Sequence, residues 1–277
     1  MILRVGEPGP IVADVAEHFR LRWQEIAREP LPPPRRPRRV GSTEVQFVRT
    51  VPENVYDALP DGDFRILEAY TRALRSAERL VYLENQFYWS SEIALILERK
   101  LRRPPSDDFR VVLVLPSDPN DGRDDTRGQL ADLIECDGGR GRVLACALQA
   151  LGKEGPHDVY VHAKIGIVDD RWLTIGSANL NEHSLFNDTE ANVVTCDPAI
   201  ARATRLRLWA EHLDRPSSEV AGDPASVIDD VWKPIAGEQL ARRRAGLAPT
   251  HRLVQLPHLS RRTRRLLGPL QGLLVDG

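Results

Sequence analysis

The sequence of 277 residues has no long hydrophobic run. No apolar stretch approaches 18 residues, so the sequence predicts no helix that spans a membrane. The first residues also lack a basic segment followed by an apolar core, and no signal peptide is visible. Since 42% of the residues are hydrophobic and 28% are charged, the composition is that of a globular protein. We expect it to be cytoplasmic or peripherally bound to a membrane.

Cysteine is also scarce. The three cysteines, Cys136, Cys146 and Cys196, are odd in number and widely spaced, which argues against a disulfide framework and against paired metal ligands. We therefore expect them to be small buried hydrophobic residues. No metal and no cofactor is predicted.

An excess of positive charge is missing as well. The formal net charge is −2, whereas general nucleic-acid binders are usually basic, so no nucleic-acid partner is expected. Lysine is rare, with 4 lysines against 34 arginines. A lysine at a chemically interesting position is therefore more informative here than in a lysine-rich chain.

Segments typical of strands and helices alternate along the middle of the chain. Strands are expected at 45–50, 79–84, 110–115, 142–147 and 190–195, and helices at 64–76, 91–101, 129–136 and 198–213, with Ser90 or Ser91 as an N-cap. This alternation predicts an α/β fold with a mixed β-sheet flanked by helices on both faces. The continuous apolar run at 111–115 is typical of a strand covered on both faces.

Four regions are expected. Residues 1–29 form an N-terminal helical segment, 30–40 a Pro/Arg-rich linker, 41–215 the α/β domain, and 216–277 a helical, Arg-rich extension. The linker could alternatively be a ligand for an SH3-type domain. The leucines and arginines after residue 260 could contact a membrane or pack on the core. The polar loop at 116–127 could flank a substrate site.

The most informative stretch contains His162, Lys164 and Asp169, followed by Ser177 and Asn179. The alternation around 160–165 predicts a strand with the His162 and Lys164 side chains on one face, about 7 Å apart. Residues 172–175 form a returning strand that ends at Gly-Ser near the start of the first. The polar groups should therefore gather at one end of a hairpin.

These residue types suit a phosphodiester. Histidine, with an ordinary pKa of about 6.5, can act as a nucleophile or a proton donor near neutral pH. Lys164 and Asn179 can donate to phosphoryl oxygens, and Asp169 is the local carboxylate that could hold the imidazole or the lysine. A lone histidine would be read as an ordinary strand residue, but the joint pattern argues against that reading.

The stretch resembles the signature of the phospholipase D superfamily (the HKD family), His-x-Lys-x4-Asp followed by Gly-Ser-x-Asn. The likeness continues through 160–171 and 175–184, through the acidic segment 187–190, and upstream in Tyr-Leu-Glu-Asn-Gln-Phe-Tyr at 82–88. It covers roughly residues 1–215. It implies a phospholipase D-like α/β sandwich, with 41–215 as a catalytic half-domain.

The resemblance implies a phosphodiesterase or phosphatidyltransferase that cleaves the distal phosphodiester bond of glycerophospholipids through a histidine phosphoenzyme. It makes His162 the general acid/base. Lys164 and Asn179 would bind phosphoryl oxygens, with Ser177 as a weaker candidate. Asp169 would support the site electrostatically, and Glu190 would orient a histidine across the interface between two half-sites. The expected partners are the phospholipid substrate and, peripherally, a membrane surface.

Members of this superfamily build one active site from two such motifs, but the other six histidines of this chain lack a lysine two residues later. Residues 3–23 resemble the stretch that closes the first half of two-motif phospholipases D. The chain therefore looks like a C-terminal half that needs a second HKD half in trans, from a homodimer or from an N-terminal half. In a homodimer, one copy of His162 would have to be the nucleophile. The alternatives are a catalytically inactive half-site or binding module, and a cardiolipin-synthase-like transferase.

Overall fold

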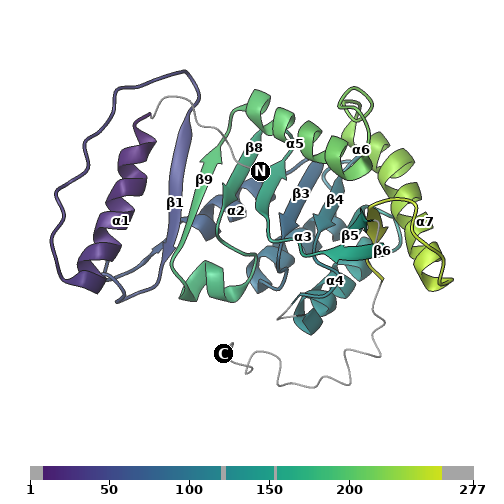
Figure 1. Cartoon of the computed structure of the whole chain (residues 1–277), viewed down its shortest axis with the longest axis horizontal. Helices are drawn as coiled ribbons and strands as arrows, with labels where there is room; N and C mark the ends of the chain where they lie inside the picture. Colours follow the sequence, from purple (N-terminus) through teal and green to yellow (C-terminus); the bar gives the residue numbers. More distant parts are fainter. Residues whose placement is uncertain (1–8, 120–122, 153–154, 258–277) are drawn as a thin grey trace.

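The computed structural model describes residues 9–119, 123–152 and 155–257, and their centre is a mixed β-sheet (Figure 1). Its strands are β1 (Val45–Val51), β2 (Asp63–Phe64), β3 (Leu80–Asn85), β4 (Arg110–Val114), β5 (Val143–Gly152), β6 (Gly155–Val159), β7 (Lys164–Val168), β8 (Trp172–Gly176), β9 (Glu190–Thr195) and β10 (Leu253–Gln255). They follow the order β10-β5-β4-β3-β7-β8-β9-β1-β2, with β6 paired to β5. Only the β3–β4 and β4–β5 pairs are parallel among these strands.

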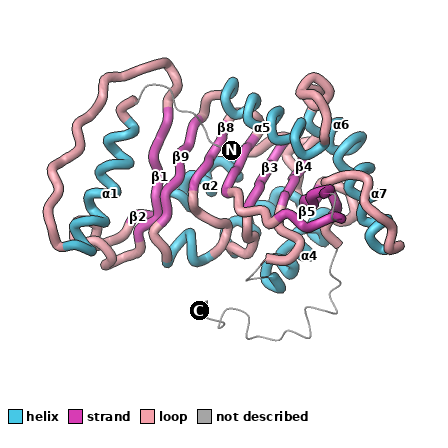
Figure 2. The backbone as a smooth tube through the Cα atoms, viewed as in Figure 1, coloured by secondary structure: helices cyan, strands magenta, loops and turns pink. Residues whose placement is uncertain are grey.

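Helices cover both faces of the sheet, which confirms the predicted fold class (Figure 2). They are α1 (Ile11–Ala27), α2 (Arg65–Ser76), α3 (Ser91–Arg102), α4 (Arg123–Asp137), α5 (Pro198–Leu213), α6 (Pro224–Val227) and α7 (Lys233–Arg244), with π-helical turns at His183–Asn187 and Ile228–Trp232. Helices α2, α3 and α4 pack on one face, and α5, α6 and α7 contribute to the core on the other. None of the helices in the described residues is both long and apolar enough to cross a bilayer.

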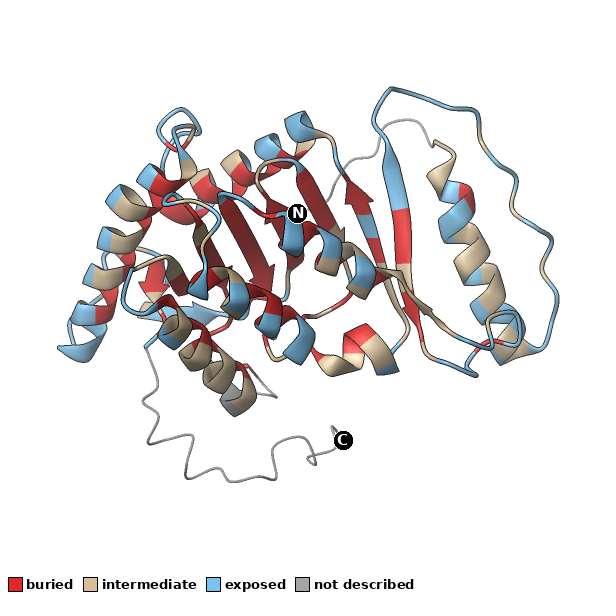
Figure 3. Cartoon of the chain, turned by 180° about the vertical axis from the view of Figure 1, so that it is seen from behind, coloured by how far each residue is buried: buried red, intermediate tan, exposed pale blue. Residues whose placement is uncertain are grey.

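Two hydrophobic cores therefore enclose the sheet, whose central strands are buried (Figure 3). Along β4, Val111 and Leu113 belong to the core under α2–α4, whereas Val112 and Val114 belong to the core under α5–α7. This confirms the prediction that the apolar run at 111–115 is covered on both faces. Ser90 is the N-cap of α3, since its Oγ accepts from the Ile93 N–H at 3.4 Å.

Some local expectations were wrong. Helix α4 begins at Arg123, so part of the predicted 116–127 loop is helical. Strand β5 continues to Gly152 because β6 pairs with its outer half. Cys146 is buried as predicted, but Cys196 is exposed because it lies in the connection between β9 and α5. The leucines and arginines after residue 260 lie outside the described residues.

Candidate active site

Four strand ends meet at one edge of the sheet. Strand β3 ends at Asn85, which is paired with Lys164 at the start of β7, while β8 ends at Gly176, opposite Asn192 near the start of β9. Because these pairs are antiparallel, the end of one strand lies beside the beginning of the next. Residues about 80 positions apart in the sequence are thereby brought to one site.

The Gln86 side chain joins the donors at this edge. Its Oε1 accepts from Lys164 Nζ at 3.0 Å and from Asn179 Nδ2 at 3.3 Å, and its Nε2 donates to the Tyr160 hydroxyl at 2.7 Å. The structure thus brings together Lys164 and Asn179, as the sequence suggested. Gln86 itself was missed as a site residue, although it lies in the Glu-Asn-Gln stretch that contributed to the family resemblance.

The predicted strand around His162 is wrong. Strand β7 begins only at Lys164, and 160–163 form a connection because the chain must pass from β6, beside β5, to a place beside β3. His162 is exposed, and its ring stacks on Tyr160 with a centroid distance of 6.2 Å. Its carbonyl oxygen accepts from the buried Lys164 Nζ at 3.1 Å. The imidazole therefore lies at the surface, while the buried ammonium of Lys164 contacts the backbone of the same residue.

The two basic groups influence each other's protonation. Burial lowers the pKa of Lys164 to about 8, and the Glu190 carboxylate partly opposes that shift. Partial burial and the charge of Lys164 lower the pKa of His162 below its ordinary value. At neutral pH the site therefore combines a mostly protonated lysine with a mostly neutral imidazole.

Glu190 is held by two serine hydroxyls. Its carboxylate accepts from Ser177 Oγ in a short contact and from Ser184 Oγ at 2.6 Å. Ser177 Oγ in turn accepts from the Ala191 N–H at 3.0 Å. The structure thus makes Ser177 a residue that fixes Glu190, and it places the charge of Glu190 within influence of Lys164.

The glycine of the Gly-Ser-x-Asn turn is required by the close approach of Asn192. A Cβ atom on Gly176 would lie 2.1 Å from Asn192 Oδ1, so no larger residue fits there without displacement. The buried Asn192 accepts from the Ala178 N–H at 3.2 Å and donates to Thr174 Oγ1 at 3.1 Å. This close approach fixes the turn that presents Asn179 to Gln86.

Asp169 lies at the opposite end of β7, about 16 Å along the strand from Lys164 at roughly 3.3 Å per residue. Its carboxylate accepts from the backbone N–H groups of Glu78, Arg79 and Leu80 at 2.7, 2.8 and 2.7 Å. The expectation that Asp169 holds the imidazole or the lysine is therefore wrong. Its carboxylate instead fixes the start of β3.

A buried polar network lies just before Gln86 on β3. Glu84 Oε2 is 3.0 Å from His212 Nε2 on α5 and accepts from the Tyr82 hydroxyl at 2.8 Å. Both Glu84 and His212 are buried. Sequence reasoning missed this pair because nothing local in either segment indicates that β3 and α5 meet.

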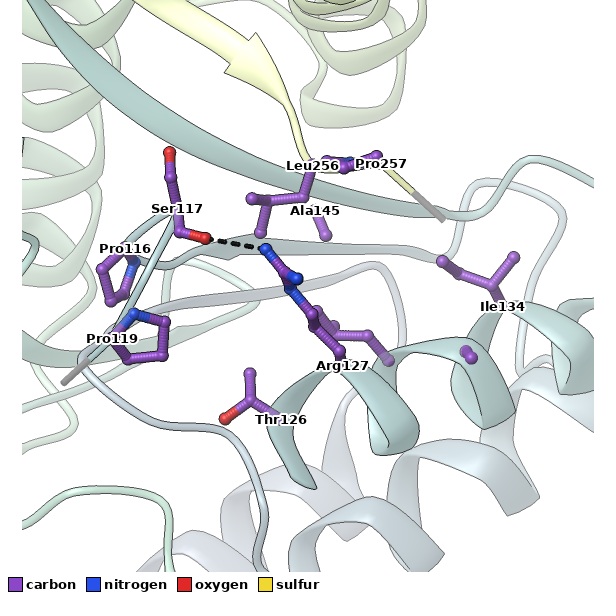
Figure 4. A pocket seen from close by; sticks show the side chains of 11 residues that line it. Pro116, Ser117, Pro119, Thr126, Arg127, Ile134, Ala145, Leu256 and Pro257 are labelled. Atoms are coloured by element: carbon purple, nitrogen blue, oxygen red, sulfur yellow. Dashed lines mark hydrogen bonds between the residues drawn. The ribbon is translucent and has the colours of Figure 1, made fainter. Parts of the chain in front are cut away.

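A small hollow lies between the 116–119 segment, α4 and the end of β10 (Figure 4). Its volume of about 20 Å³ is enough for a water molecule and too small for a lipid group. Arg127 lines it and donates to the carbonyl oxygen of Ser117 at 3.1 Å. The hollow therefore does not extend the substrate site.

Among the described residues, no group of three or more histidine, cysteine or acidic side chains is arranged to hold a metal ion.

Comparison with known proteins identifies the fold's relatives. Residues 70–210, just over half of the chain, match the family model described as "Cardiolipin synthase, PLD-like domain". The chain belongs to the phospholipase D superfamily. Phospholipase D zeta 1 of Arabidopsis thaliana is 30% identical over 228 residues, which cover 61% of this chain and 21% of that protein. Phospholipase D A of Dictyostelium discoideum is 27% identical over 267 residues, covering 75% of this chain and 21% of that protein.

Two solved structures were also found to resemble this chain. NucT from Helicobacter pylori aligns with a TM-score of 0.46 at 17% identity and covers 62% of this chain and 97% of its own. Nuc from Salmonella typhimurium, a phospholipase D family member, aligns with a TM-score of 0.45 at 18% identity, with coverages of 63% and 96%. The chain spans about a fifth of the length of the curated phospholipases D that it matches.

Proposed function

We propose that this phospholipase D superfamily chain forms half of a phosphodiesterase site that cleaves the distal phosphodiester bond of glycerophospholipids and uses a second His-x-Lys motif in trans. The observation that carries the proposal is the convergence of Lys164 and Asn179 on Gln86 Oε1, where Lys164 also donates to the carbonyl oxygen of the exposed His162. The names of the phospholipase D relatives support the class of substrate.

The acceptor oxygen of Gln86 marks a position where a phosphoryl oxygen could bind. An ammonium and an amide already donate to that point, and a phosphoryl oxygen would receive the same two hydrogen bonds with stronger charge assistance. These donors would stabilise the charge that develops on the phosphoryl oxygens during the reaction. Because His162 is exposed, its ring is accessible to the phosphorus or to the leaving oxygen of a bound substrate.

The proposed reaction needs two imidazoles. A ring nitrogen of the first imidazole attacks phosphorus, and the bond from phosphorus to the head-group oxygen breaks. The second histidine, as an imidazolium, protonates the leaving alcohol. Water then attacks phosphorus, the phosphorus–nitrogen bond breaks, and the second imidazole takes the proton of water. The products are the head-group alcohol and phosphatidic acid. His162 corresponds to the acid/base, or to either role when two copies share a site.

A transferase reaction is the second candidate, because the matching family model is described by cardiolipin synthase. It differs only in the second step, where an acceptor alcohol replaces water and gives a new phosphatidyl ester. Adding glycerol to the assay separates the two outcomes, since transfer produces phosphatidylglycerol at the expense of phosphatidic acid.

The test is turnover of phosphatidylcholine by the full chain, followed as release of choline and phosphatidic acid. We expect His162→Ala to abolish turnover, with His157→Ala as the matched control because His157 is an exposed histidine on β6, outside the site. Turnover that survives His162→Ala would remove the catalytic assignment.

A further inference from the structure

Between helix α1 and strand β1 the chain follows a path rich in proline and arginine, which bows outward beside the helix (Figure 1). We call residues 30–39 the proline arm, whose sequence is Pro-Leu-Pro-Pro-Pro-Arg-Arg-Pro-Arg-Arg. The arm belongs to no α-helix or strand, and none of its backbone groups makes a backbone hydrogen bond within the described part of the chain. The proposed function uses none of its residues.

The exposure of the proline arm has the repeat of a polyproline II helix. Leu31, Pro34 and Pro37 are half-buried, whereas the two residues after each of them are exposed. A polyproline II helix has three residues per turn, so these three side chains form one ridge along it. No residue of the arm has a positive φ, and its five prolines each fix φ at about −65°. One ridge of the arm therefore faces the protein, and two ridges face outward.

The conformation of the arm depends on its own prolines more than on contacts with the rest of the chain. One ion pair joins it to α1, where Arg36 Nη2 donates to Asp14 Oδ1 at 3.3 Å. Both side chains are largely exposed, so this pair contributes little to stability. A polyproline II segment loses little conformational entropy on binding because it is already ordered. The arm is therefore a preorganised ligand.

The two outward ridges carry different groups. The first consists of Pro30, Pro33, Arg36 and Arg39, and the second of Pro32, Arg35 and Arg38. Pro30 and Pro33 are one turn apart, about 9 Å along the axis, which is the Pro-x-x-Pro spacing. SH3-type domains bind this spacing with grooves lined by aromatic side chains. Arg35 lies on the neighbouring ridge, just beyond Pro33.

The charge of the arm adds a second requirement for its partner. The arm has four arginines and no acidic residue, although the whole chain has a formal net charge of −2. A complementary groove must therefore be acidic beside its aromatic pockets. A nucleic acid or an anionic membrane would use the arginines alone and would give no role to the ridge of prolines.

We propose that the proline arm is the docking ligand for a partner protein domain that has an aromatic-lined groove and an acidic pocket. Pro30 and Pro33 fill the aromatic pockets, and Arg35 pairs with the acidic pocket. The ridge of Leu31, Pro34 and Pro37 stays turned toward the protein. An interface of so few residues is small, and the complex is readily reversible.

The first test is titration of the full chain into an isotope-labelled SH3 domain that accepts Pro-x-x-Pro-x-Arg peptides, followed by NMR chemical shifts. We expect saturable binding that Pro33→Ala weakens about tenfold, because an aromatic pocket is left unfilled. Pro34→Ala is the matched control, since it removes the same ring from the ridge that faces the protein. Both substitutions loosen the arm alike, so the difference between them reports the ridge. The affinity of Pro34→Ala should stay near that of the unmodified chain.

The second test concerns the charge. Arg35→Glu should weaken binding of the same domain about tenfold or more, because a carboxylate would face the acidic pocket. Arg99→Glu is the control, since Arg99 is an exposed arginine on α3. It makes the same change in net charge away from the arm and should bind like the unmodified chain. Circular dichroism checks that all four variants are folded.

Absence of binding would overturn the proposal, as would equal effects of Pro33→Ala and Pro34→Ala. Binding that Arg35→Glu abolishes and Pro33→Ala leaves intact would show a purely electrostatic contact and would also overturn it. The same holds if the arm binds phosphatidylglycerol vesicles and not the domain. None of these readouts measures turnover, so the proposed function can fail while this inference stands.

Discussion

The two ends of β7 carry parts of one sequence motif in opposite states. At Lys164, a buried ammonium and the Asn179 amide both donate to Gln86 Oε1, and the imidazole of His162 close by in the sequence is exposed. At the far end, both oxygens of Asp169 are occupied by three backbone N–H groups. One end holds donors that a ligand could take over, and the other holds a carboxylate whose hydrogen bonds are complete.

This difference shows that residues close together in a motif need not share a role. The hydrogen bonds at the lysine end are incomplete, since Asn179 Oδ1 is buried without a hydrogen-bond partner among the described residues. The aspartate end stabilises the entry into β3, the same strand whose exit carries Gln86. Asp169 therefore contributes to the site through the position of a strand.

Substitution at Lys164 should have the largest effect on turnover. Lys164→Met keeps the length of the side chain but removes the ammonium, and we expect the rate of phosphatidylcholine cleavage to fall about 10²- to 10³-fold. Stability in urea should be unchanged or slightly higher, because burial of the charge is costly. Normal turnover by Lys164→Met would show that the end of β7 at Lys164 does not take part in catalysis.

Substitution at Asp169 should have the opposite profile. Asp169→Asn loses the negative charge that accepts three backbone hydrogen bonds, so we expect the free energy of unfolding to fall by about 2–4 kcal/mol in urea titrations. Turnover per folded molecule should stay near that of the unmodified chain. Asp188→Asn, at an exposed position near the site, serves as the control. Selective loss of turnover without loss of stability would refute the structural role.

Gln86→Leu should have an intermediate effect. It removes the acceptor that aligns Lys164 and Asn179, and we expect turnover to fall about tenfold, equivalent to about 1.4 kcal/mol in the barrier. The affinity for the lipid should weaken less than the rate, because the donors stay in place but lose their alignment. A tenfold fall in kcat/KM that came from a rise in KM alone, with kcat unchanged, would argue that Gln86 only contacts the head group.

The smallest effect is a shift in the protonation of His162. Since the charge of Lys164 lowers the pKa of His162, Lys164→Met should move that pKa upward, and Asp169→Asn should leave it unchanged. Titration of the imidazole C–H resonances by NMR measures both variants. An equal shift in the two would mean that the ends of β7 are electrostatically coupled.

Locally determined elements were predictable from the sequence. Strand β9 and helix α5 begin and end at the predicted residues, and α5 starts with an Asp197 N-cap followed by proline. The break before β7 was not predictable, because alternation at 160–165 cannot show that β6 pairs with β5 while β7 pairs with β3. The roles of Gln86 and Asp169 depend on the same long-range pairing.

Helix α1 gives a second example of this limit. The sequence predicted an N-terminal helical segment within residues 1–29, where apolar residues recur every three or four positions, and Ile11–Ala27 is helical. The period could not show which way the apolar face points. The inner face of α1 carries the buried Ala13 and the His18 ring, which lies beside Phe47 and Tyr56, and most of the large apolar side chains of the helix are exposed.

The most direct test of the account is turnover by mixtures of the unmodified chain with His162→Ala at fixed total concentration, under dimer-forming conditions. If each site needs the imidazoles of two copies, turnover should fall with the square of the unmodified fraction. A linear fall would show that each copy works alone, and it would contradict the claim that the lysine end of β7 is half of a shared site.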